Sequence, residues 1–310
     1  MLIDAQLGVN VFFVLSGFLI TTLLLQEENA KQAISLKGFY IKRAFRIFPV
    51  YYTLLAVYLI LQLADVLYFS GLSWLTSLTY TKYLNWHDDW ETGHLWSLSI
   101  EEQFYLVWPF VFKFAKNYRK HFAFSIILIV PVLRMLYIKT QYQWMDELTL
   151  FQRVDAIMWG CVFAMYHDKL LAVCQQYIAK YKWVMWMPFL AIPALSAFTL
   201  INHRFDMHMG AFIVPFGNTT GTIADVAIGF IVLICIHYQK TGVFKILNNK
   251  PMDYIGKLSY SLYIWQQLFF SENIGWASSL PLNIVLLFTV ANISYYAIEK
   301  PCLRLREKFL

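Results

Sequence analysis

Long apolar runs separated by short polar segments are the dominant pattern of this sequence. A helix that crosses a membrane needs about 20 mostly apolar residues, and runs of about that length recur along the whole chain. They show no period-2 alternation, and a barrel strand would be only about 10 residues long. We interpret nine runs as transmembrane helices: 8–26, 47–69, 98–115, 121–139, 154–172, 183–201, 221–238, 255–271 and 282–299.

The basic residues predict which side each loop faces. Lys and Arg concentrate in five segments, which are residues 27–46, 113–121, 165–183 and 239–257 and the C-terminus. Because cytoplasmic loops carry excess Lys and Arg, we expect all five on the cytoplasmic side. They alternate with the poorly charged loops only if a tenth, more polar run does not cross. That run, 70–86, is therefore expected to be re-entrant or interfacial.

Composition supports the same reading. Of 310 residues, 59% are apolar and only 14% are charged, against roughly 25% charged in soluble domains. The excess apolar surface must face lipid, and no polar stretch is long enough to fold separately. The sequence therefore predicts an all-α, polytopic transmembrane helix bundle of about nine spans plus one re-entrant or interfacial helix, in a single domain, 1–310. The net charge of +6 lies in short loops, so we expect membrane lipid and no nucleic acid as a partner.

This topology places residues 1–8 outside, although no signal peptide is evident. That arrangement would follow naturally if a further helix preceded the chain. The four cysteines form no C-x-x-C pair, so neither a disulfide framework nor a metal site is expected.

Arg43 and Arg46 are the first candidate binding residues. They are three apart, hence on one helical face, and directly precede a span at the cytoplasmic side. Guanidinium groups bind phosphate bidentately. The alternative is a topogenic cluster that touches anionic lipid.

The segment from His94 to Pro109 is the most informative. Ser99 and Glu102 have capping-box spacing, which predicts a helix start. Glu101 and Glu102 would then lie in the first turn and enter a span. Intramembrane carboxylates are functional candidates by default, here as general bases or cation ligands. The alternative is that both only complement the helix N-terminus.

Three further segments carry polar residues within apolar runs. Ser16 and Gly17 favour close helix packing or a polar lining. Arg153 and Asp155 are two apart, so each is expected to have its partner elsewhere, and structural ion pairing is the plainer reading. A stripe with Tyr260, Tyr263 and Gln267 should face the bundle interior. There is no Walker loop, Rossmann fingerprint or H-E-x-x-H motif.

Together and in this order, the motifs resemble the acyltransferase 3 family of membrane acyltransferases. The resembling segments are FFVLSGFLI, Phe-Tyr-x-x-Arg-x-x-Arg-Ile-x-Pro, HLWSLSIEEQFYLVWP, Arg-x-Asp, SYSLYIWQQ and the terminal Glu-x-Pro. The resemblance implies a bacterial inner-membrane bundle with a cytoplasmic C-terminus. It also implies transfer of an acyl group, often acetyl, from acyl-CoA to a carbohydrate or glycolipid acceptor. A homo-oligomer is compatible with it.

The resemblance implies that Arg43 and Arg46 meet the CoA phosphates and that Glu101, Glu102, Arg153 and Tyr260 line the transfer or acceptor region. Catalytic roles are expected for Glu101, Glu102 and His94, donor binding for Arg43 and Arg46, and substrate contacts for Ser16, Arg153, Asp155, Tyr260 and Tyr263. The family begins with a helix that carries an Arg and, about ten residues later, a His thought to be the catalytic base. This chain starts after that helix, and Gln266 occupies a position where many relatives have His. His94 is the remaining histidine inside a matched motif.

Two other functions compete with acyl transfer. One is a catalytically inactive, truncated acyltransferase-like bundle. The other is a transporter or flippase, suggested by carboxylates and arginines within a bundle. Transporters commonly carry inverted repeats, and the sequence shows none, which counts against the transporter.

Overall fold

The computed structural model of the chain describes residues 5–85, 88–140, 149–204, 221–239 and 241–309. Every regular element in these ranges is helical, which confirms the predicted all-α class. The described residues form two compact units. The first unit comprises Met1–Ile34 and Ile100–Phe244, and the second unit comprises Ser35–Ser99 and Lys245–Leu310.

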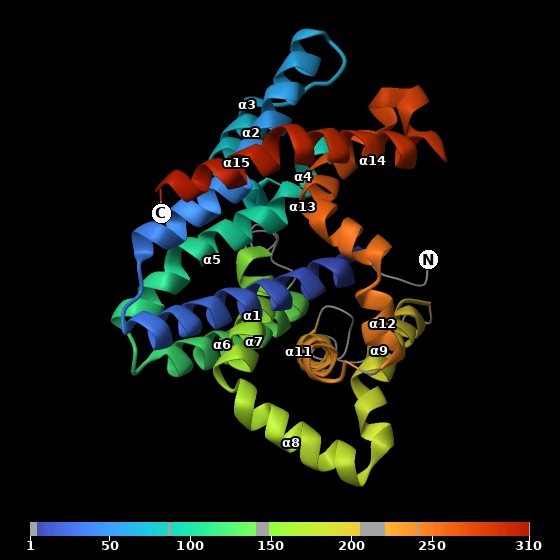
Figure 1. Ribbon diagram of the computed structural model, residues 1–310. Coiled ribbons are helices and arrows are strands. Elements are labelled where there is room, and N and C mark those ends of the chain that lie inside the picture. The colour runs from blue at the N-terminus through green and yellow to red at the C-terminus, as the bar shows by residue number, and fades with distance from the viewer. Residues whose placement is uncertain (1–4, 86–87, 141–148, 205–220, 240, 310) are drawn as a thin grey trace. The chain divides into compact units, whose positions relative to one another are not determined.

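The first unit is built around three neighbouring helices, α1, α6 and α7, which lie side by side in Figure 1. Its helices are α1 (Ala5–Lys31), the part of α5 (Leu95–Phe114) from Ile100 onward, α6 (Arg119–Thr140), α7 (Thr149–Met165), α8 (His167–Lys180), α9 (Met187–Arg204, after the short η3, Lys182–Trp186) and α11 (Thr222–His237). The buried side chains of α1 and α7 meet in the core of this unit.

Two glycines allow α1 and α7 to approach closely. A Cβ added at Gly17 would lie 1.9 Å from the carbonyl oxygen of Ile157, and one added at Gly160 would lie 2.1 Å from that of Val14. No side chain fits at either distance, so the two backbones are in direct contact, as small residues permit between membrane helices. The predicted packing role of the Ser-Gly pair is confirmed for Gly17.

The second unit contains the long helix α2 together with several shorter helices and short turns. Its elements are α2 (Leu36–Leu63), α3 (Gly71–Leu78), η1 (Lys82–Leu84), α4 (Trp90–Gly93), α13 (Lys250–Phe269), η4 (Glu272–Ser278), α14 (Leu282–Ser294), η5 (Tyr295–Glu299), α15 (Lys300–Leu305) and η6 (Arg306–Phe309). The short α12 (Gly242–Leu247) crosses the boundary between the units. Figure 1 shows α14 and α15 following one another along one line.

Four described helices are long and apolar enough to cross a membrane: Gln6–Lys31, Leu36–Leu63, Lys182–Ile201 and Leu282–Phe309. A fifth counts if Arg153–Met165 and His167–Lys180, bent by 80°, form one broken span. The predicted run 154–172 is thus not a single straight helix, because the chain turns at Tyr166 between α7 and α8. The described residues therefore support a multi-pass helical architecture but do not confirm the count of nine spans.

Two local predictions have different outcomes. The start of α5 was predicted at Ser99, but α5 begins at Leu95, and the Ser99 hydroxyl donates back to the Leu95 carbonyl at 2.9 Å. Such back-bonding holds a serine inside a helix instead of at its cap. The non-crossing segment 70–86 contains only the eight-residue α3 and the three-residue η1 among its described residues, too short to span a bilayer.

Candidate functional site

A buried carboxylate with two hydroxyl partners lies in the first unit. Glu101 is in the second turn of α5, not in the first turn as predicted, and it is 3% exposed. The Tyr105 hydroxyl, one turn further along α5, donates to Glu101 Oε1 at 2.6 Å. The Ser16 hydroxyl of α1 donates to the same oxygen. Glu101 therefore lies too deep in α5 to act only as a partner of the helix N-terminus.

This arrangement suits a group that handles protons. Hydrogen bonds donated to a carboxylate are charge-assisted and favour its ionised form. They also fix its orientation, because α1 and α5 each supply one donor. Glu102 follows Glu101 directly and is half-buried, so it faces a different side of α5. Of the two adjacent carboxylates, Glu101 is the one that Ser16 contacts.

A second polar cluster in the first unit contains two arginines and two aspartates. Both Oδ atoms of Asp155 accept from Arg134 at 2.9 Å. Arg153 donates to Asn10 at 3.1 Å, and Asn10 donates in turn to Asp225 at 2.8 Å. The predicted separation of Arg153 and Asp155 is confirmed, because each has a different partner. Asp155 has the ion pair that the plainer reading expected, and its substrate role stays a prediction.

Three members of this cluster were missed by sequence reasoning: Asn10, Arg134 and Asp225. Asp225 is fully buried in α11, a helix in an apolar run, and it was not singled out. The cost of polar groups in a membrane interior was the signal that could have found them. Their pairing could not be deduced, since Asn10 and Asp225 are 215 residues apart.

His94 lies in the second unit, next to Tyr263 of α13. Its Nε2 lies 3.1 Å from the Ile264 carbonyl, so Nε2 carries the proton of the neutral ring. The Tyr263 hydroxyl donates to the His94 carbonyl at 2.8 Å, and the rings are 5.5 Å apart. Burial lowers the pKa of His94 to about 4, although hydrogen bonds to the backbone carbonyls of Ile264 and Glu91 act to raise it. The imidazole is therefore neutral near pH 7.

The same unit contains an unexpected ion pair between Lys82 and the partly buried Asp89. Lys82 is fully buried, and its ammonium donates to Asp89 at 3.0 Å and to Ser73 at 2.5 Å. Burial lowers the pKa of Lys82 although Asp89 opposes this. Burial alone would raise the pKa of Asp89, but donors from Ser73, Thr92 and Lys82 lower it overall. Lys82, one of the few lysines in the loops predicted to be external, is thus a structural residue.

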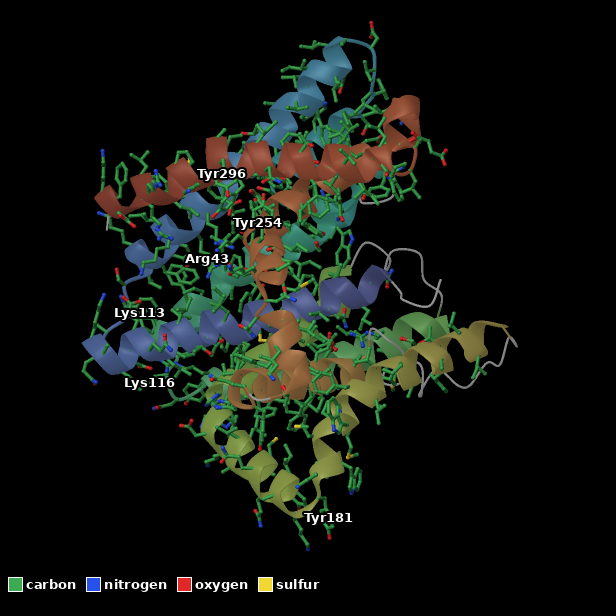
Figure 2. The ribbon with its side chains drawn as sticks, turned by 45° about the vertical axis from the view of Figure 1, so that its right-hand side comes forward. Arg43, Lys113, Lys116, Tyr181, Tyr254 and Tyr296 are labelled. Atoms are coloured by element: carbon green, nitrogen blue, oxygen red, sulfur yellow. The ribbon has the colours of Figure 1, made fainter. Side chains whose placement is uncertain are left out.

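The remaining predicted residues of the second unit lie on α2 and α13. Arg46 is exposed and Arg43 is half-buried, with its guanidinium 5.8 Å from the Phe39 ring (Figure 2). The Tyr260 hydroxyl donates to the Ile47 carbonyl at 2.7 Å. The buried Tyr260 therefore faces α2 and not lipid, as predicted for the polar stripe.

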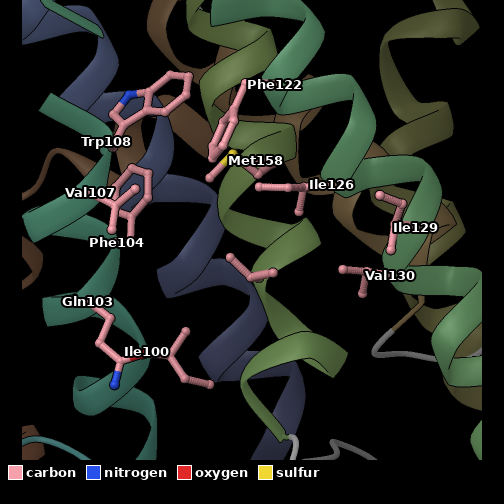
Figure 3. A pocket seen from close by; sticks show the side chains of 11 residues that line it. Ile100, Gln103, Phe104, Val107, Trp108, Phe122, Ile126, Ile129, Val130 and Met158 are labelled. Atoms are coloured by element: carbon pink, nitrogen blue, oxygen red, sulfur yellow. The ribbon is translucent and has the colours of Figure 1, made fainter. Parts of the chain in front are cut away.

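A pocket of about 300 Å³ lies in the first unit between α5, α6 and α7 (Figure 3). Its lining residues are Ile100, Gln103, Phe104, Val107, Trp108, Phe122, Ile126, Ile129, Val130, Val154 and Met158. Apart from Gln103 and the Trp108 indole nitrogen, these side chains are apolar. The pocket therefore does not fit a phosphate or sugar ligand. In the described part of the chain, no group of three or more His, Cys, Asp or Glu side chains could hold a metal ion.

The structure thus brings together Ser16 with Glu101 in the first unit and His94 with Tyr263 in the second. Arg153 and Asp155 belong to one cluster, in which Asp155 accepts from Arg134 and Arg153 donates to Asn10. The predicted donor-binding arginines belong to the second unit. Each unit therefore holds a distinct part of the predicted site.

Comparisons with known proteins identify the family. The acyltransferase 3 family model, described as an acyltransferase domain, matches residues 3–298. The chain is 28% identical over 95% of its length to the O-acetyltransferase OatA of Staphylococcus aureus strain NCTC 8325, of which it covers 52%. It is 27% identical, again over 95% of its length, to the peptidoglycan O-acetyltransferase OatA of Listeria monocytogenes, of which it covers 51%.

The chain therefore spans about half the length of the curated relatives that it matches. No solved structure matches it significantly. The family match and the apolar helices agree on a multi-pass membrane protein. This chain belongs to the acyltransferase 3 family of membrane acyltransferases.

Proposed function

We propose that this chain transfers an acyl group, in particular acetyl, from acyl-CoA to a hydroxyl of a cell-wall carbohydrate. Family membership supports the reaction class. The names of the relatives, O-acetyltransferase and peptidoglycan O-acetyltransferase, support acetyl as the group and a wall polysaccharide as the acceptor. Among the described groups, the hydroxyl-bonded carboxylate of Glu101 is the observation that best supports the chemistry.

In this proposal Glu101 acts as the general base. The acceptor hydroxyl attacks the thioester carbonyl, and the carboxylate takes the hydroxyl proton. A carbon–oxygen bond forms, the carbon–sulfur bond breaks, and the proton ends on the CoA thiolate that leaves. A positioned base of this kind typically contributes about 10²–10⁴ in rate. Ser16 and Tyr105 hold the carboxylate in place from two helices.

Arg43 and Arg46 are proposed to bind the phosphates of the donor. They are three apart in α2, and neither is buried, so both can reach a water-soluble ligand. The guanidinium fork matches phosphate geometry better than an ammonium does. The alternative role for Arg43 and Arg46 is contact with anionic lipid head groups.

His94 is proposed to contribute as a neutral imidazole. With Nε2–H held by the Ile264 carbonyl, Nδ1 carries the lone pair. A pKa of about 4 makes this nitrogen a weaker base than an ordinary histidine. His94 is therefore better suited to orient a substrate hydroxyl than to remove its proton as a general base.

The proposed location is the bacterial cell membrane, with the basic loops and the C-terminus in the cytoplasm. The charge pattern supports this orientation, and it places Arg43 and Arg46 on the side where acyl-CoA is found. Cysteine labelling of single variants at Lys42 and Lys308, both exposed, tests it. Labelling of both from the cytoplasmic side is expected, and labelling of either from outside would reverse the topology.

Reconstitution tests the function directly. The purified chain in lipid nanodiscs would receive acetyl-CoA labelled in its acetyl group together with a soluble peptidoglycan oligosaccharide. We expect an acetylated oligosaccharide and one free CoA per acetyl transferred. A folded chain that yields neither product would be an inactive bundle. A chain in vesicles that moves solute without releasing CoA would be a transporter.

A further inference from the structure

The apolar pocket of the first unit is a groove along α5 and α6. None of its lining residues has a role in the proposed reaction. Phe104 and Trp108 of α5 line one wall, and Ile129 and Val130 of α6 line the other, as Figure 3 shows. Val107 and Ile129 are 52% and 53% exposed, so the groove is open at its rim. Its volume of about 300 Å³ lies at the lower end of typical ligand sites.

The lining selects a hydrocarbon ligand. A sugar or nucleotide would lose its hydrogen bonds to water here and recover few of them, which is costly for each polar group. An alkyl chain loses none. Aromatic side chains and Met158 add contacts that adapt to a flexible chain.

One end of the groove leads to a basic turn. Phe122 lines the groove 6.1 Å from the Trp108 ring, and Trp108 lies 5.7 Å from Phe112. The Arg119 guanidinium is 3.7 Å from the Phe112 ring centre. We use the name basic turn for Lys113, Lys116, Arg119 and Lys120, at the end of α5 and the start of α6.

The basic turn keeps an excess of positive charge. Arg119 and Lys116 both pair with Glu28, at 2.7 Å and 3.2 Å, so one carboxylate faces two cations. Lys113, Lys116 and Lys120 are exposed, and Figure 2 shows Lys113 and Lys116 at the same end of the unit. Basic side chains next to spanning helices attract anionic head groups electrostatically.

We propose that the groove and the basic turn together form a binding site for one anionic phospholipid. Its acyl chain lies in the groove along α5 and α6, and its phosphate lies at Lys113, Lys116 and Lys120. The apolar lining accounts for the chain, and the charge of the turn accounts for the head group. A zwitterionic lipid of the same chain length satisfies only the first requirement. The proposal does not depend on acyl transfer.

Photolabelling tests the site. The purified full chain would be reconstituted with phosphatidylglycerol or phosphatidylcholine that carries the same diazirine-labelled acyl chain, and the labelled peptides would be mapped. We expect phosphatidylglycerol to label α5 and α6 at the groove residues several-fold more than phosphatidylcholine does. Equal labelling by both lipids, or labelling spread evenly over exposed apolar helix faces, would overturn the proposal.

Matched variants separate groove and turn. Ile129→Trp fills the groove and should reduce the labelling by phosphatidylglycerol at least fivefold. Leu128→Trp, at a neighbouring exposed position outside the lining, should not. Replacing Lys113, Lys116 and Lys120 by Gln should bring phosphatidylglycerol labelling down to the phosphatidylcholine level. The same replacement at the exposed Lys169, Lys180 and Lys182 is the charge control.

Two of these outcomes would contradict the proposal. One is undiminished labelling of a folded Ile129→Trp protein. The other is an equal loss of labelling in both lysine triples. A thermal melting curve for each variant shows whether it is folded. If Ile129→Trp does not fold, the map of labelled peptides in the unaltered protein decides whether the lipid lies in the groove. Added glycerol phosphate should not compete with the lipid, because it has no chain for the groove.

Discussion

The Ser16 hydroxyl donates to the Glu101 carboxylate, although 85 residues separate the two in the chain. This bond joins α1 to α5 within the first unit, and the Tyr105 hydroxyl supplies a second donor to the same oxygen. The adjacent Gly17 brings the backbone of α1 against α7. The Ser-Gly pair therefore has two roles: Ser16 contacts Glu101, and Gly17 lets α1 pack against α7.

Gly17→Ala should destabilise the first unit. The added methyl would lie 1.9 Å from the Ile157 carbonyl oxygen, so α1 and α7 must separate. Overpacking of this kind costs about 1–3 kcal/mol. Gly8→Ala on the same helix is the control, because a Cβ there meets no atom within 4 Å. Thermal melting in detergent should show a lower midpoint for Gly17→Ala alone, and equal midpoints would refute the close contact.

The Lys82–Asp89 pair should matter more than an exposed pair. Lys82→Met leaves the partly buried Asp89 without its cation, and loss of one partner costs about 3–5 kcal/mol where both partners are buried, which sets the upper end of the expected effect. Replacing both partners by apolar residues should recover part of that loss. Lys257→Met breaks the exposed pair with Asp253 and should leave the melting midpoint unchanged. Equal effects of the two single substitutions would contradict the burial of Lys82.

Stability should fall as the pH falls from about 6.5 to 4. His94 has a folded-state pKa of about 4, below that of an unfolded histidine. Between these values the unfolded chain binds more protons, so its population increases as acid is added. The expected loss is on the order of 3 kcal/mol. Any loss from Asp89, whose pKa is also lowered, begins at lower pH.

Comparing the unaltered protein with His94→Gln isolates the contribution of His94 to the pH dependence of stability. The amide can donate to the Ile264 carbonyl but does not titrate in this range. Unfolding free energies measured at several pH values should converge for the two proteins as the pH falls. Curves that stay parallel from pH 6.5 to 4 would show that His94 is not held neutral by burial.

Arg43→Ala should raise the KM for acyl-CoA while kcat changes little. Loss of one charge-assisted phosphate contact costs about 1.5–3 kcal/mol, or roughly 10- to 100-fold. The KM of Arg43→Lys should lie between those of the unaltered protein and Arg43→Ala, because lysine keeps the charge but lacks the forked guanidinium group. The exposed neighbour Lys42, changed to Ala, is the control. An unchanged KM for Arg43→Ala would remove Arg43 from the donor site.

The sequence predicted what depends on local pattern. The apolar runs predicted α1 and the presence of α2, although α2 begins and ends earlier than the run 47–69. The alternation of charge predicted the short non-crossing segment that contains α3, and the Ser-Gly pair predicted the packing role of Gly17. The spacing of Arg153 and Asp155 predicted that each would have a separate partner. All of these follow from local features, namely run length, residue spacing, charge alternation and small residues.

Contacts between distant segments were beyond such reasoning. Capping-box spacing predicted a helix start at Ser99, but the preceding residues His94 to Leu98 fold into a turn and the first residues of α5. Nothing local marks Lys82 as buried, because its partners Ser73 and Asp89 meet it only after the chain folds. The partner of Asp225 lies on α1, at Asn10. Single residues gave no sign of these pairings.

The central claim is that Glu101 is the base in acyl transfer, and single-turnover kinetics of Glu101→Gln test it most directly. The label would be followed from acetyl-CoA to the oligosaccharide, with Glu27→Gln on α1 as the matched control, since Glu27 pairs with the exposed Lys31. We predict that Glu101→Gln lowers the transfer rate by about 10²–10⁴ with an unchanged KM for the donor. A folded Glu101→Gln protein that transfers acetyl as fast as the control would contradict the account.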